Sequence, residues 1–279
     1  MKTYLGETYA WSDKNRREVN EDLCGWIITG GAPDEVTNEG KAAAFFVCDG
    51  VSDSHGAETV RLVERYIRRG LARLVGDCYE FAEMDQITRD EEIALQMKDI
   101  LLDVDAKLHP QWYYGATASV AFVFGGWVYT ANLGDSPIFL VRLNDLDEPK
   151  EELPENLRTI EKLYRCGNEA GKAVEDGAMS EEEALHSDLK DVLSVRVLGD
   201  RPGSGAISTG KAVLGSNNLL LLGSDGALSV LAERELLEVI RDMLADGLSE
   251  MNKELYRRIQ ADEEATDNYT LLAQVIRTR

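Results

Sequence analysis

The sequence predicts an α+β protein in which antiparallel strands pack against amphipathic helices. One observation is a series of β-rich runs separated by short glycine-containing turns, at residues 115–124, 127–133 and 138–143. Strands joined this tightly are typical of hairpins, and a sheet built from hairpins is antiparallel. A second observation is a pair of long segments, 57–76 and 87–108, in which apolar residues recur at helical spacing. These predict helices that lie on a hydrophobic core.

Further strands are predicted before and between these segments. The first covers residues 3–11 and the second covers 23–29, with a polar stretch between them. Residues 30–34 are predicted to form a loop by their composition. Residues 42–48 are continuously apolar and stop at Asp49-Gly50, which is typical of a strand buried on both faces.

The C-terminal part of the chain repeats these patterns. An apolar run at 219–222 predicts a strand that stops at Gly-Ser-Asp-Gly. Helices are predicted over 233–244 and 249–259, and a final strand over 271–276. The strongly acidic, aperiodic stretch at about 144–190 is expected to be an exposed flap subdomain. No long linker marks a boundary, so residues 1–279 are predicted to form a single domain.

The charge of the chain restricts the kinds of ligand that it binds. Its 279 residues contain 30 Lys and Arg but 51 Asp and Glu, a formal net charge of −21. Nucleic-acid binding depends on basic residues that displace counterions from phosphates, so no nucleic-acid partner is expected. Three histidines are too few for a His-rich zinc or iron site. A metal ion would have oxygen ligands, which favours hard divalent cations.

Cysteine usage and the N-terminus indicate the compartment. The four cysteines are scattered and are expected to be reduced structural residues. The first seven residues lack the apolar core of a signal peptide, and no apolar run approaches the ~20 residues that cross a bilayer. We therefore expect a cytoplasmic protein with no membrane partner.

Acidic residues recur where predicted strands begin or end. Asp49, Asp225 and Asp267 each adjoin a strand, and Glu21-Asp22 precedes another apolar run. Taken singly, such acidic residues most often belong to turns or solvated loops and bind no ligand. Carboxylates that converge at strand ends, however, repel one another unless a cation lies between them. The ordered set therefore indicates a candidate metal site.

Six motifs in order make the sequence resemble the metal-dependent serine/threonine protein phosphatases, the protein phosphatase 2C or PPM family, in its bacterial form. They are Arg-Glu-Val-Asn-Glu-Asp at 17–22, Asp-Gly at 49–50, Gly-Ala-Thr-Ala-Ser at 115–119, Asn-Leu-Gly-Asp-Ser at 132–136, Ser-Asp-Gly at 224–226 and Asp-Asn-Tyr-Thr at 267–270. Residues 175–184 resemble the family's flap, and Leu-Ser-Val-Arg-Val-Leu-Gly at 193–199 resembles a further signature. The resemblance spans almost the whole chain.

The resemblance implies a four-layer α/β/β/α sandwich of two antiparallel sheets flanked by helices. Two Mn²⁺ or Mg²⁺ ions lie at the sheet ends in this family. By similarity, Asp49 would bridge both ions and the carbonyl of Gly50 would bind one. Asp225 and Asp267 would complete the other. A third, weakly bound ion would involve Asp135.

Three further residues are assigned to catalysis by the same resemblance. Glu21 and Asp22 would act mainly through metal-bound waters, and Arg17 would bind the substrate phosphate, because a guanidinium pairs with two oxygens at once. Hydroxide formed between the ions would attack phosphorus in line, without a covalent intermediate. The chain departs from the family at Val51, where many members have a histidine, and at Ser229, where the family has a ligand for the third ion.

The implied function is Mn²⁺- or Mg²⁺-dependent hydrolysis of phosphoserine and phosphothreonine in proteins. The substrates would be phosphorylated proteins, such as the products of a serine/threonine kinase, and the enzyme is expected to be a monomer. One alternative is a catalytically weak regulatory module that binds a phosphorylated partner, and another is a phosphatase of small phosphorylated metabolites. Asp225→Asn separates an enzyme from a binding module, because only the enzyme would lose its function.

Overall fold

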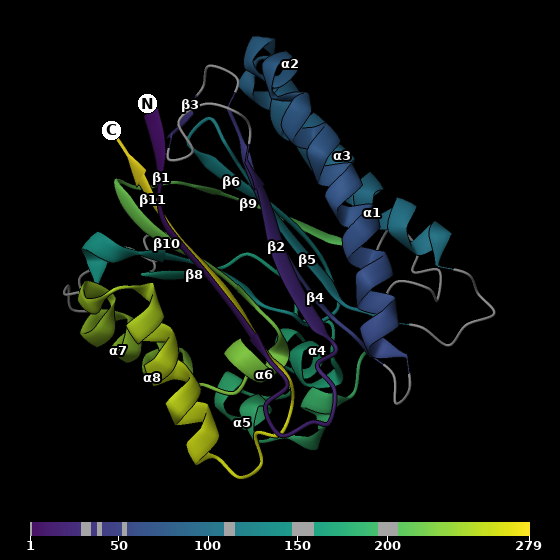
Figure 1. Ribbon diagram of the computed structural model, residues 1–279, viewed down its shortest axis with the longest axis vertical. Coiled ribbons are helices and arrows are strands. Elements are labelled where there is room, and N and C mark those ends of the chain that lie inside the picture. Colours follow the sequence, from purple (N-terminus) through teal and green to yellow (C-terminus); the bar gives the residue numbers. More distant parts are fainter. Residues whose placement is uncertain are drawn as a thin grey trace.

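Two antiparallel sheets lie face to face in the structure, a computed structural model that describes residues 2–28, 35–37, 41–51, 55–108, 115–146, 159–194 and 206–279. Helices cover the outer face of each sheet, so the chain forms four layers (Figure 1). This arrangement confirms the predicted α/β/β/α sandwich. The loop predicted at 30–34 and residues 195–199 of the last motif lie outside the described residues.

The first sheet has six strands among the described residues. In spatial order they are β3 (Glu35–Thr37), β1 (Lys2–Asp13), β11 (Tyr269–Thr278), β10 (Asn217–Gly223), β7 (Ile138–Arg142) and β8 (Ile160–Lys162). Its centre joins the two ends of the chain, because β1 pairs with β11 from Thr3↔Thr278 onward. The termini therefore lie side by side in Figure 1.

The second sheet has five strands among the described residues. In spatial order they are β2 (Asp22–Ile28), β4 (Ala43–Asp49), β5 (Ala118–Phe124), β6 (Trp127–Leu133) and β9 (Ser208–Val213). The β5–β6 connection is the predicted hairpin. Its two turn residues, Gly125 and Gly126, have φ of 59° and 83°, which glycine adopts without the penalty that a Cβ brings.

Helices form the two outer layers. Over the five-stranded sheet lie α1 (Gly56–Gly76), α2 (Cys78–Glu83) and α3 (Gln86–Lys107). Over the six-stranded sheet lie α7 (Glu233–Met243) and α8 (Leu248–Ala261). The shorter α4 (Glu169–Glu175), α5 (Glu181–Leu185) and α6 (Asp225–Leu228) lie at one end of the sandwich (Figure 1). No helix that the structure describes is both long and apolar enough to cross a membrane.

Three hydrophobic clusters separate the four layers, and they explain why the central strands carry apolar residues on both faces. In β4, Phe46 and Cys48 belong to the cluster under α1 and α3, whereas Phe45 and Val47 belong to the cluster between the sheets. Alternate side chains of a strand point to opposite faces, so a strand between two clusters is buried on both.

The predicted hairpin between β6 and β7 is wrong. β6 pairs with β5 and β9, whereas β7 pairs with β10 and β8 in the other sheet. Residues 134–137 therefore carry the chain from one sheet to the other. Both strands are buried on both faces, so their sequences carried no signal for which neighbour each would choose.

The acidic middle stretch contains one core strand that its composition did not indicate. β8 is an edge strand of the six-stranded sheet, and its Ile160 is buried with 3% exposure. The expectation that the whole of 144–190 lies outside the core is thus wrong at this strand. Beyond β8, α4 and α5 expose most of their acidic side chains.

Candidate active site

Two acidic strand ends lie side by side at one end of the five-stranded sheet. Asp22 begins β2 and Asp49 ends β4, and the two are direct partners in the antiparallel ladder. Directly opposed residues place their side chains on the same face of a sheet. The backbone of both aspartates is fixed by the paired strands β2 and β4, of which β4 is buried along almost its whole length.

The six-stranded sheet brings two more carboxylates to the site. Asp225 is the first residue of α6, directly after β10, and Asp267 stands two residues before β11. β10 and β11 are antiparallel neighbours with Gly223 opposite Leu271. The end of one strand and the start of the other therefore lie together, as the motif order implied.

Asp22 is a buried carboxylate without a hydrogen-bond partner. It is 5% exposed, and neither of its oxygens is hydrogen-bonded to any residue that the structure describes. Burial, and then the charge of Asp225, raises the pKa of Asp22 from 3.8 to about 7, while the nearby side chains of Ser224, Thr270 and Asp49 act in the opposite direction. A buried acceptor left unpaired is costly, which indicates that this carboxylate is made for a ligand that is not part of the chain.

Asp49 and Asp225 share this electrostatic environment. Burial, followed by the charges of Asp22 and Asp225, raises the pKa of Asp49 well above its ordinary value. Burial and the charge of Asp267 raise the pKa of Asp225. The Gly226 N–H donates to Asp225 Oδ1 at 2.6 Å and holds the side chain in place. Asp22, Asp49 and Asp225 thus form one group, in which the charges of Asp22 and Asp225 oppose ionisation of Asp49.

Two glycines allow the backbone to close around these carboxylates. A Cβ on Gly226 would lie 2.1 Å from the carbonyl oxygen of Asn268. A Cβ on Gly50 would lie 2.8 Å from the carbonyl of Gly56 and 2.9 Å from that of Glu21. All three distances are shorter than the contacts that real Cβ atoms make. The glycine after each strand-ending aspartate is therefore required by close approach of another segment.

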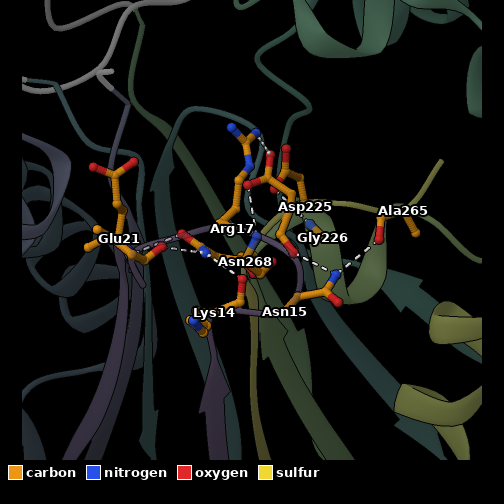
Figure 2. A network of polar contacts seen from close by, with 11 residues as sticks. Lys14, Asn15, Arg17, Glu21, Asp225, Gly226, Ala265 and Asn268 are labelled. Atoms are coloured by element: carbon orange, nitrogen blue, oxygen red, sulfur yellow. Dashed lines mark hydrogen bonds and ion pairs between the residues drawn. The ribbon is translucent and has the colours of Figure 1, made fainter. Parts of the chain in front are cut away.

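Asn268 ties the segment before β2 to the start of β11. Its Oδ1 accepts from the Glu21 N–H at 2.8 Å, and its Nδ2 donates to the carbonyls of Lys14 and Val19 at 3.1 and 3.0 Å. Figure 2 shows this side chain at the centre of the network. Asn268 is only 4% exposed, so these hydrogen bonds are shielded from water. Together they fix the course of residues 14–21 past the site.

Asn15 forms a second tie between the same two segments. Its φ of 51° lies in the left-handed region, which asparagine tolerates better than most residues. Its Nδ2 donates to the carbonyls of Ala265 and Asp267 at 3.0 and 2.8 Å. Arg17 follows two residues later and points toward the aspartates (Figure 2).

Arg17 lies at the mouth of the acidic group, where it pairs with Asp267. Its guanidinium nitrogen Nη2 is 2.9 Å from Asp267 Oδ2, and the two side chains are 55% and 43% exposed. The hydrogen bond and the charge of Asp267 raise the pKa of Arg17, with smaller contributions from Asp225 and Glu21. The exposed guanidinium is accessible to an incoming anion.

Glu21 contributes its backbone more than its side chain. Its carbonyl accepts from the Gly50 N–H at 2.9 Å. Its carboxylate lies toward the first residue of α1, since a Cβ on Gly56 would be 2.4 Å from Glu21 Oε1. In Figure 2 this carboxylate points away from Arg17 and Asp225. The site residues predicted from sequence thus come together, with the side chain of Glu21 turned aside.

Asp135, the residue predicted for a third ion, is buried near the other aspartates. Burial, and then the charge of Asp225, raises the pKa of Asp135 to about 7. Asn168 Nδ2 donates to Asp135 Oδ2 at 3.2 Å, and Asp191 adds a further negative charge. Sequence reasoning missed both neighbours, because they lie in the acidic stretch and just beyond it, where carboxylates and amides are most simply explained as solvated.

The residues fit a divalent cation by their chemistry, although their side chains do not enclose one. Four acidic groups with raised pKa values and two unpaired buried oxygens are the donors that hard cations prefer. Among the residues that the structure describes, however, no three acidic, histidine or cysteine side chains converge as ligands of one ion. Asp267 instead pairs with Arg17.

Comparison with known proteins agrees with this geometry. The family model described as protein phosphatase 2C matches residues 33–150. A protein of Paramecium tetraurelia named "Probable protein phosphatase 2C 2" is 27% identical over 226 residues, which is 76% of this chain and 73% of that protein. The chain is thus similar to protein phosphatases 2C, and this similarity supports a hydrolase of the protein phosphatase class.

Solved structures of bacterial phosphatases share the fold of this chain. The serine/threonine phosphatase Stp1 from Staphylococcus aureus has a TM-score of 0.69 at 19% identity and covers 96% of this chain, with 94% of its own length matched. The catalytic domain of the phosphatase PstP, solved with two manganese ions, has a TM-score of 0.63 at 17% identity, with 99% of this chain and 100% of that one covered.

Proposed function

We propose that this protein removes phosphate from phosphoserine and phosphothreonine in proteins, in a reaction that depends on Mn²⁺ or Mg²⁺. The observation that carries the proposal is the buried, unpartnered carboxylate of Asp22 beside Asp49 and Asp225. Without a cation, this group would repel a phosphate dianion and would oppose its own ionisation. With a cation bound, the acidic group becomes a site that can accept the phosphate of a phosphatase substrate.

The proposed ligands are the side chains of Asp49, Asp225 and Asp267 and the carbonyl of Gly50, with Asp22 behind them. Asp135 would contribute to a third, weaker site. When bound, two such ions lower the pKa of water toward neutrality and neutralise charge on phosphoryl oxygens. The manganese pair in the PstP structure is a precedent within the fold, and the ligand assignment here is ours.

The chain's own residues orient the substrate. Arg17 now pairs with Asp267, and its guanidinium is exposed on the solvent side. We propose that it exchanges this carboxylate for two oxygens of the substrate phosphate, for which its planar donors are suited. Asn268 and Asn15 keep the arginine in reach by fixing the segment that bears it.

The leaving serine or threonine oxygen needs a proton, and this chain offers no side chain for that step at Val51. Val51 cannot donate a proton, but it is 41% exposed. Solvent therefore reaches the position that histidine occupies in many members of the family, and water can protonate the leaving group.

The test is release of phosphate from a phosphothreonine peptide and from p-nitrophenyl phosphate, with Mn²⁺ and with EDTA. We expect activity with Mn²⁺ only, and at least a hundredfold loss in Asp225→Asn, since loss of a metal ligand removes charge stabilisation in the transition state. The matched control Asp242→Asn, at an exposed position of α7, should retain activity. Equal rates with Mn²⁺ and EDTA would refute metal dependence, and binding of phosphopeptide without turnover would favour the regulatory module.

A further inference from the structure

Helix α1 carries a row of arginines that the fold does not explain. In a chain with a net charge of −21, this helix has five arginines and two glutamates, a formal charge of +3. Arg61, Arg65, Arg69 and Arg73 are spaced four residues apart and are all exposed. Residues at this spacing are neighbours on a helix surface, so the four form one continuous row.

The arginine row lacks the ion pairs that basic residues make on α7 and α8. In the part of the chain that the structure describes, none of the four is paired with a carboxylate. Every basic residue of α7 and α8 is, in the pairs Arg234–Glu238, Arg241–Asp242, Lys253–Glu250, Arg257–Glu254 and Arg258–Glu254. The fifth arginine of α1, Arg68, pairs with Glu64 at 2.7 Å.

This arrangement is unfavourable for the isolated helix. Like charges four residues apart destabilise a helix by about 0.2–0.5 kcal/mol a pair, and the row contains three such neighbours in succession. Arg73 lies in the last turn, where the helix dipole favours a positive charge. Arg61 and Arg65 receive no such compensation from the helix dipole, and their exposed charges remain available to an external anion.

The row begins beside the candidate active site. Gly56, the first residue of α1, is in contact with the backbone of Gly50, and the Glu21 carboxylate lies against it. At 1.5 Å per residue, Arg61 stands about 8 Å along the helix from Gly56, and the row extends about 18 Å further to Arg73. An extended peptide at about 3.3 Å per residue would cover this length with five or six residues.

A groove between α1 and α3 borders the distal half of the row. Its volume is about 490 Å³, and Tyr66, Arg69 and Arg73 line one wall. Asp99 and Asp103 line the other wall, and Lys107 pairs with Asp103 at 3.2 Å. These carboxylates weaken the positive potential at Arg69 and Arg73. Arg61 and Arg65, nearer the site, should therefore attract an anion most strongly.

We propose that the arginine row binds an acidic segment of the phosphoprotein substrate, next to the phosphorylated residue held in the active site. The proposal rests on the phosphatase function proposed above. Guanidinium groups pair with carboxylates in two-point contacts, and arginine clusters are a recurring means of binding acidic peptides. A nucleic acid is disfavoured, because the chain as a whole would repel a long polyanion.

Direct binding tests the surface without relying on catalysis. The probe is a fluorescein-labelled, unphosphorylated peptide with six consecutive glutamates, followed by anisotropy in 50 mM salt. We compare the natural chain with a row variant (Arg61→Gln, Arg65→Gln, Arg69→Gln, Arg73→Gln) and a control variant of equal net charge (Arg234→Gln, Arg241→Gln, Lys253→Gln, Arg257→Gln). We expect the peptide to bind about tenfold more weakly to the row variant and with unchanged affinity to the control variant. Replacing only Arg61 and Arg65 should weaken binding more than replacing only Arg69 and Arg73.

Kinetics link this surface to the substrate. Three phosphothreonine peptides are compared as substrates in the presence of Mn²⁺. One has glutamates on the N-terminal side of the phosphothreonine, one has them on the C-terminal side, and in the third the glutamates are replaced by glutamines. In the row variant we expect KM to rise about tenfold for an acidic-flanked peptide, with kcat unchanged. Hydrolysis of p-nitrophenyl phosphate and of the glutamine peptide should be unchanged, which also shows that the variant is folded.

Two results would overturn the docking surface: equal peptide affinity in the row and control variants, or tighter binding of the natural chain to duplex DNA or to phosphatidylserine vesicles than to the acidic peptide. The proposed function fails by a different result, which is the absence of Mn²⁺-dependent hydrolysis of p-nitrophenyl phosphate by the natural chain. The anisotropy measurement tests whether the arginine row binds an acidic peptide whether or not the protein is an active phosphatase.

Discussion

Replacing Asp22 by Asn should stabilise the metal-free protein at neutral and alkaline pH. The carboxylate is 5% exposed and has no hydrogen-bond partner among the described residues, and its pKa is raised to about 7. Because the folded state holds this proton more tightly than the unfolded chain, stability falls as the pH rises from about 4 to 7. Asparagine carries no charge and escapes this loss.

The magnitude follows from the pKa. A rise from 3.8 to about 7 corresponds to about 4 kcal/mol at pH above 7, because each pKa unit is worth about 1.4 kcal/mol. The buried amide would itself lack partners, which costs about 2 kcal/mol. The net gain is about 2 kcal/mol at pH 8, or about 4–8 °C in Tm, and close to zero at pH 5.

Thermal and urea unfolding in EDTA between pH 5 and pH 8 measure this difference. Asp99→Asn, at an exposed position of α3, is the matched control and should show no pH-dependent difference. With saturating Mn²⁺ the order should reverse, because a cation that binds the folded state stabilises the natural chain. A variant that is less stable by the same amount at every pH would refute the reasoning.

Three other perturbations have defined outcomes. Mn²⁺ should raise the Tm of the natural chain by several degrees, and EDTA should reverse the rise; an unchanged Tm would argue against a cation site. Gly226→Ala should cost more than 2 kcal/mol in urea unfolding, because its Cβ would lie 2.1 Å from a backbone carbonyl, whereas Gly76→Ala, with no atom within 4 Å, should be neutral. Asn268→Ala should cost about 2–4 kcal/mol, since it leaves one N–H and two carbonyls unpaired, and a change below 0.5 kcal/mol would contradict its role as a tie.

Much of the fold could be predicted because its long elements have strong periodicity. The helix predicted over 57–76 is α1 at Gly56–Gly76, and that predicted over 87–108 is α3 at Gln86–Lys107. The approach of Asp49, Asp225 and Asp267 could also be predicted, since each adjoins a strand end and their motifs stand in a known order. The periodicity of the long helices and the order of the motifs therefore both predicted features that the structure contains.

The remaining features depend on partners that local sequence does not specify. The turn at 134–137 contains Gly134 and Pro137, residues that are common in hairpin turns, yet it crosses between sheets. The side chain of Glu21 turns toward Gly56 although its backbone belongs to the site. Asn168 and Asp191 meet Asp135 only because the flap folds back on the sheet ends. Each of these contacts is set by tertiary packing.

The pairing of β1 with β11 has a consequence for synthesis of the protein on the ribosome. Ser12 and Thr270 contact each other across 258 residues, and the other neighbour of β1 is the three-residue strand β3. At about 5–20 residues per second, β1 waits roughly 13–50 s for its main partner. During that interval the nascent chain exposes an unpaired strand edge, so chaperone capture should be strongest before β11 emerges. Asp267, two residues before β11, completes the acidic group at the same late moment.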